Sequence, residues 1–89
     1  MFFKKNYRLS FWRVEDENRN KILSDKTLLE ILHLLREKYG FKLVSVNLLN
    51  YGRDEIIIRL HPSFFSKFLE DFLKMVDNVV HSVSFREKY

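Results

Sequence analysis

The sequence predicts an α+β domain in which strands and helices follow the order βαββαβ. Four short segments have the alternating or aliphatic pattern typical of strands, and two longer segments repeat apolar residues at helical spacing. The chain has 89 residues, too few for two separate cores, so we expect a single domain over residues 1–89. Hydrophobic residues make up 46% of it and aromatic residues 16%, which is ample for a packed core and argues against intrinsic disorder.

Residues 7–14 predict the first strand, because apolar and polar side chains alternate along them. One face of this strand holds Tyr7, Leu9 and Phe11, and the other holds Arg8, Ser10 and Trp12. After a polar loop, Ser24 or Asp25 can cap a helix that runs to residue 39, since their oxygens accept hydrogen bonds from free amide groups of the first turn. Gly40 is a natural stop for this helix. Its apolar stripe consists of Leu28, Leu29, Ile31, Leu32, Leu34 and Leu35.

The second half of the chain predicts a hairpin, a helix and a last strand. Residues 42–49 and 55–61 are rich in β-branched and aliphatic side chains, and Gly52 between them can adopt the positive φ of a tight turn. Pro62 then opens a helix at a position where its missing N–H costs nothing. The apolar stripe of this helix consists of Phe65, Phe68, Leu69, Phe72, Leu73 and Val76. A weaker alternation over residues 79–86 predicts the last strand.

Two helices with one apolar stripe each are expected to cover one face of a four-stranded antiparallel sheet. Right-handed crossovers then favour the ferredoxin-like or RRM-like arrangement. The opposite face has no helix to cover it, so we expect the functional surface there. The residues predicted on this face are Arg8, Ser10 and Trp12 from the first strand and Ile57, Arg59 and His61 from the third.

No catalytic or metal-binding motif is recognisable in the sequence. His33, His61 and His81 fall on different predicted elements without ligand spacing, and the chain has no Cys. A phosphate-binding loop and a nucleophile motif are also missing. We therefore expect no catalytic residue, no metal and no cofactor. The lack of Cys fits a reducing cytoplasmic compartment, and no apolar run is long enough to predict a membrane span.

The basic surplus of the chain lies mainly near its beginning. The formal net charge is +4, and residues 1–23 hold six basic against three acidic side chains, a local excess of +3. Such a surface can bind a polyanion by releasing counterions, although an ordinary solvated edge would show the same charges. The basic residues in this segment are Lys4, Lys5, Arg8, Arg13, Arg19 and Lys21.

Trp12 and Ile57 are the candidate partner-binding residues. A standard RNA-recognition motif stacks bases on aromatic side chains of its third strand, whereas residues 55–61 contain none. Flanked by Arg8 and Arg59, the two apolar side chains could stack bases beside phosphate contacts. They could equally form an apolar docking patch with a basic rim. The missing aromatic residues favour a protein contact on the sheet.

Three stretches of the chain resemble the Pop-five subunit family of archaeal and eukaryotic ribonuclease P. They are residues 5–11, 23–29 and 49–65, and the resemblance as a whole covers about residues 4–76. The first stretch is similar to the family's opening, where a basic residue and an Arg/Tyr pair lead into a strand. The second is similar to its entry into the first helix. The third is similar to its hairpin, its aliphatic strand with Arg, and the aromatic residue that soon follows.

The resemblance implies a non-catalytic protein subunit of ribonuclease P, an enzyme whose RNA removes 5′ leaders from precursor tRNA with Mg²⁺. The implied partners are ribonuclease P RNA, precursor tRNA and other protein subunits, one of them TIM-barrel-like, with self-association also allowed. An archaeal, cytoplasmic ribonucleoprotein is the implied setting. The hydrophobic surface, with Trp12 and Ile57, would then contact the partner subunit. The RNA-binding residues would be Lys4, Lys5, Arg8, Arg13, Arg19, Lys21 and Arg59.

Three other interpretations remain open at this point. A dimeric small-molecule-sensing domain of the ACT or Lrp-effector kind has the same element order, but the Gly-rich ligand loop after the first strand is missing here. A CRISPR-associated Cas-two-like nuclease also shares the fold. It carries an Asp at the end of its first strand, and Glu15 and Asp16 only place acids nearby, without the usual Tyr-Asp ending. A structural protein of an archaeal virus or mobile element is also compatible with the composition.

Overall fold

The computed structural model describes residues 4–13, 24–48, 53–76 and 80–88, and every structural statement below concerns these residues. Along the chain they form β1 (Lys5–Arg13), α1 (Asp25–Tyr39), β2 (Lys42–Asn47), β3 (Asp54–Leu60), the 3-10 turn η1 (Pro62–Phe64), α2 (Phe65–Met75) and β4 (Val80–Lys88). The predicted order βαββαβ is therefore confirmed. The predicted turn at Gly52 lies outside the described residues.

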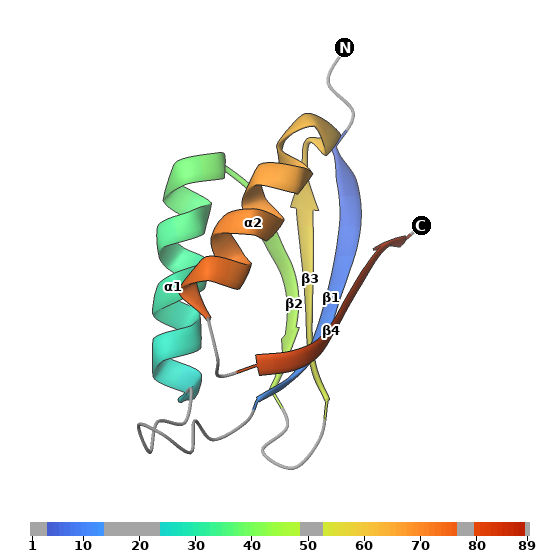
Figure 1. The fold of residues 1–89 in the computed structure, drawn as a ribbon. Helices are drawn as coiled ribbons and strands as arrows, with labels where there is room; N and C mark the ends of the chain where they lie inside the picture. Colours follow the sequence, from blue (N-terminus) through green and yellow to red (C-terminus); the bar gives the residue numbers. More distant parts are fainter. Residues whose placement is uncertain (1–3, 14–23, 49–52, 77–79, 89) are drawn as a thin grey trace.

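The four strands form one antiparallel sheet in the order β2-β3-β1-β4. Figure 1 shows α1 and α2 on the same side of this sheet, so neither of the two described helices covers its other side. This is the ferredoxin-like α+β arrangement that the sequence predicts. At the centre of the sheet, Arg8 on β1 lies opposite Ile57 on β3 and opposite Arg86 on β4.

The core fills the space between the sheet and the two helices. Leu9 and Phe11 of β1 are fully buried, as are Ile56 and Ile58 of β3. The ring of Phe11 packs 5.6 Å from that of Phe72 on α2, measured between centroids. The alternation read from residues 7–14 therefore identified the core side of β1 correctly.

The ends of α1 follow from single residues. The Ser24 side chain accepts a hydrogen bond from the Thr27 amide, as the capping prediction requires. Gly40 closes the helix at a φ of 67°, a left-handed conformation that glycine adopts without strain. Both predicted helix signals are thus confirmed.

The apolar stripes are narrower than predicted. On α1 the buried positions are Leu28, Ile31, Leu32 and Leu35. The prediction that Leu29, Leu34 and Leu73 also face the core is wrong, because they are 44%, 57% and 40% exposed. Successive helix residues are about 100° apart, so a side chain next to a buried one falls on the flank of the helix.

His61 is not part of β3, which ends at Leu60. Its Nδ1 instead accepts a hydrogen bond from the Ser63 amide and caps the η1 turn. The prediction that His61 faces outward from the third strand is therefore wrong, since Pro62 starts the turn directly after it. Neither helix in the described ranges has the length and apolar character that crossing a bilayer requires.

Candidate nucleic-acid interface

The side of the sheet opposite the helices is called here the open sheet face. Residues opposite one another on neighbouring strands share a face, and Tyr7, Leu9 and Phe11 occupy the core side of β1. The strand register therefore assigns the open sheet face. Its described side chains are Asn6, Arg8, Ser10, Trp12, Lys42, Ser45, Asn47, Glu55, Ile57, Arg59, Ser84 and Arg86.

Arg53 reaches the same face from the residue before β3. Its guanidinium donates a hydrogen bond of 2.6 Å to the Ser84 hydroxyl on β4, so its side chain spans the intervening strand β1. Arg53, Arg86 and Lys42 were not among the residues predicted from the sequence. The alternation of side chains along the last strand could have placed Arg86 on the same face as Arg8. A bulge in the β1–β4 pairing shifts the register, however, and this shift cannot be predicted from the alternation.

The open sheet face is strongly basic. Among its described side chains, Glu55 is the only carboxylate, and its Oε1 lies 3.6 Å from the Nε of Arg8 in a partly exposed ion pair. Exposed pairs of this kind contribute little to stability. The remaining charges are all positive and come from every strand and from the segment before β3. The cations are Arg8, Lys42, Arg53, Arg59 and Arg86.

Cations also lie directly opposite one another across strands. Arg8 of β1 pairs with Arg86 of β4, and Lys42 of β2 pairs with Arg59 of β3. Like charges placed directly opposite destabilise a sheet. The arrangement therefore weakens the isolated fold and raises the positive potential of this face.

The expected exposed patch of Trp12 and Ile57 is absent from the described surface. Ile57 lies on the open sheet face but is only 6% exposed, so the prediction of an exposed Ile57 is wrong. Trp12 is 39% exposed at the far end of β1. Because Ile57 is level with Arg8, four residues of strand separate it from Trp12, roughly 13 Å. The two side chains therefore do not form one surface.

Arg13 was predicted to bind RNA, but in the structure its side chain connects parts of the fold. Its Nε donates a hydrogen bond of 2.7 Å to Asp54, its second nitrogen donates one of 3.2 Å to the other oxygen of Asp54, and the third nitrogen bonds Asp25 on α1. Burial lowers the pKa of Arg13, but the hydrogen bonds that it donates to Asp25 and Asp54 outweigh this effect and keep the pKa above its ordinary value. The guanidinium is thus engaged inside the fold, and we exclude it from the interface.

The other predicted basic residues are spread over several places. Lys4 is exposed just before β1. Lys5 lies 3.2 Å from Glu87 of β4, measured from Nζ to the carboxylate oxygen. Arg19 and Lys21 lie outside the described residues. Of the predicted set, the structure places Arg8 and Arg59 together on the open sheet face.

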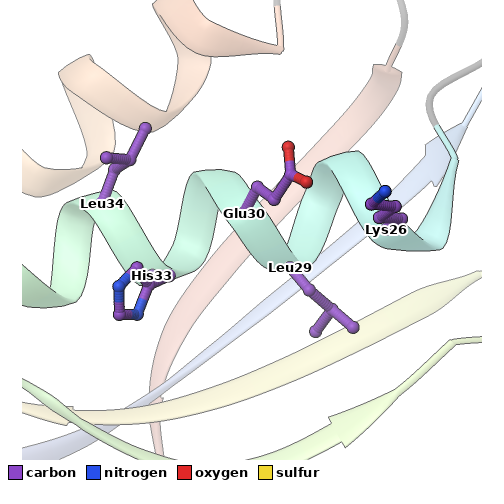
Figure 2. Close-up of a pocket in the computed structure, with 5 residues that line it drawn as sticks. All are labelled: Lys26, Leu29, Glu30, His33 and Leu34. Carbon is purple, nitrogen blue, oxygen red and sulfur yellow. The ribbon is translucent and has the colours of Figure 1, made fainter.

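A hollow of about 710 Å³ lies on α1. Figure 2 shows its lining, in which Leu29 and His33 point to one side of the helix and Leu34 to the other. The lining is completed by Lys26 and Glu30, so every lining residue comes from one helix. In the described part of the chain, no three His, Cys, Asp or Glu side chains group as metal ligands.

Comparison with known proteins found no family model and no curated protein that matches the chain.

Proposed function

We propose that the chain is a non-catalytic RNA-binding subunit that holds RNA phosphates on its open sheet face. The observation that carries the proposal is the pair of opposed cations, Arg8 with Arg86 and Lys42 with Arg59. A phosphate between two such cations replaces their repulsion by two attractions. Guanidinium groups suit this role because their planar donors match phosphate oxygens.

The setting that we propose is ribonuclease P, in which the RNA cleaves precursor tRNA and protein subunits support it. Two observations support this setting: the resemblance of residues 4–76 to the Pop-five family, and a basic sheet face on a ferredoxin-like fold. In this setting the partners are ribonuclease P RNA, precursor tRNA and further protein subunits. Trp12, which is 39% exposed, is proposed to contact a partner subunit.

A triple charge reversal tests the RNA-binding surface. We expect Lys42→Glu, Arg59→Glu and Arg86→Glu together to weaken RNA binding and to lower the slope of log affinity against log salt by about 2, since each contact to a single strand contributes roughly 0.7. The control carries the same charge change on the helix side, at Lys26, Arg36 and Lys74. Fluorescence anisotropy over a salt series measures both. Equal affinities for the two triple variants would contradict the proposal.

The ribonuclease P setting has its own test. The tagged chain is purified from its source cell and the bound RNA is sequenced. We expect ribonuclease P RNA to be enriched over total RNA with the unaltered chain and to be lost with the triple variant. Enrichment of other RNAs alone would contradict this setting while leaving the RNA-binding surface in place.

A further inference from the structure

A second hollow lies between the end of α1, the η1 turn and the residue before β1, and we call it the end pocket. It has a volume of about 280 Å³ and is lined by Lys4, Tyr39, Gly40, His61, Ser63 and Phe64. Figure 1 shows the end of α1, the η1 turn and the start of β1 gathered at the same end of the molecule. The lining is aromatic and carries one cation and no carboxylate.

Three rings form a preformed surface at the end pocket. The Phe64 ring lies 6.2 Å from the Tyr39 ring and 5.9 Å from the His61 ring, between centroids. Phe64 is nevertheless 45% exposed. An aromatic side chain held among other rings and still open to solvent is suited to stacking with a planar group.

The neighbouring side chains hold this surface in place. The Lys38 ammonium and the Tyr39 hydroxyl both donate hydrogen bonds to the same oxygen of Asp71 on α2, and these bonds keep the pKa of Asp71 below its ordinary value. The Tyr39 and Phe68 rings form a T-shaped pair with an interplanar angle of 86°. The imidazole of His61 is bonded to both the amide and the hydroxyl of Ser63. Little rearrangement is therefore required before a planar group can bind.

The end pocket continues the basic path of the open sheet face. Arg59 precedes His61 by two residues, and Lys42 follows Gly40 by two, so each cation lies about 7 Å of extended chain from the pocket. Lys42 and Arg59 are also one of the opposed cation pairs. Lys4, the residue before β1, also lines the pocket. A strand whose phosphates follow these cations would arrive at the aromatic surface.

We infer that the end pocket binds an unpaired base of an RNA strand whose phosphates lie on the open sheet face. Single strands are held by this combination of cations along the backbone and aromatic side chains under the bases. The inference deepens the proposed function and rests on it. It adds a preference for single-stranded over double-stranded RNA, because bases inside a duplex cannot enter the pocket.

Phe64→Leu tests the inference, with Phe85→Leu as the control. Phe85 is matched in residue type and exposure, at 47%, but it contacts Phe65 on another part of the surface. Base stacking on one aromatic ring contributes about 1–3 kcal/mol, so we expect Phe64→Leu to weaken single-stranded RNA binding about fivefold or more. Affinity for an RNA duplex of equal length should not change. Phe85→Leu should leave both affinities unchanged, and thermal unfolding verifies that both variants fold.

A fluorescent base in the RNA reports directly whether a base stacks in the end pocket. A single-stranded RNA that carries 2-aminopurine is titrated with the unaltered chain, and stacking in the end pocket should quench its emission. Phe64→Leu should remove that quenching, and Phe85→Leu should keep it. If both variants bind and quench like the unaltered chain while the triple charge reversal weakens binding, the pocket inference is overturned and the proposed function stands. If the triple reversal has no effect either, the proposed function fails.

Discussion

Asp54 illustrates how one residue can join three elements. Its carboxylate is fully buried at the start of β3 and binds the Arg13 guanidinium at the end of β1, which in turn bonds Asp25 in the first turn of α1. The Arg13 side chain is only 11% exposed. Its charge would therefore be left partly unpaired and poorly hydrated if Asp54 lost its own charge.

We expect Asp54→Asn to lower the free energy of unfolding by about 3 kcal/mol, because removing one partner of a buried ion pair leaves the other uncompensated. Urea denaturation measures the change. The control is Glu55→Gln on the next residue, whose partly exposed pair with Arg8 should contribute less than about 1 kcal/mol. A loss at Asp54 no larger than that at Glu55 would show that the buried pair does not hold the elements together.

At the scale of elements, the sequence predicts more about the helices than about the sheet surface. Ser24 and Gly40 mark the ends of α1 through local chemistry, and the structure confirms both. The side-chain neighbours on the sheet depend on register, which a bulge shifts between Ser10 and Trp12 in the β1–β4 pairing. Local pattern does not reveal such a shift.

Because neighbours on the sheet depend on contacts between strands, part of the candidate site was predicted wrongly. Arg8 and Arg59 were identifiable from alternation within their own strands. Arg86 and Lys42 become part of the site only through their partners on neighbouring strands. Ile57 is covered although it lies on the open face, and the sequence gives no measure of that coverage. Arg13 is engaged by carboxylates that lie 12 and 41 residues away along the chain.

The opposed cations on β1 and β4 predict opposite effects on stability and on binding. Arg86→Glu places a carboxylate opposite Arg8 and turns a repulsive cross-strand pair into an attractive one. We expect the free energy of unfolding to rise by about 0.2–1 kcal/mol, while affinity for RNA falls. Urea denaturation and anisotropy on the same sample measure the two effects. A variant that loses both stability and affinity would contradict this account of the pair.

In the whole molecule, the two sides of the sheet have different roles: one packs against the helices and stabilises the fold, and the other is the proposed binding surface. The core between the sheet and the helices contains most of the buried apolar residues, whereas the open sheet face carries like charges that oppose folding. Small domains are stable by only a few kcal/mol, so a polyanion that neutralises this face should stabilise the whole molecule by mass action. Binding and folding are therefore coupled through the sheet.

The most direct test maps where RNA touches the protein. Backbone amide signals are followed by NMR during titration with a short single-stranded RNA. We expect the largest shifts at Arg8, Arg59 and Arg86 and through the His61–Phe64 turn, with little change at Glu30 and His33 on α1. Shifts concentrated on α1, with the sheet signals unchanged, would contradict the claim that the open sheet face binds RNA.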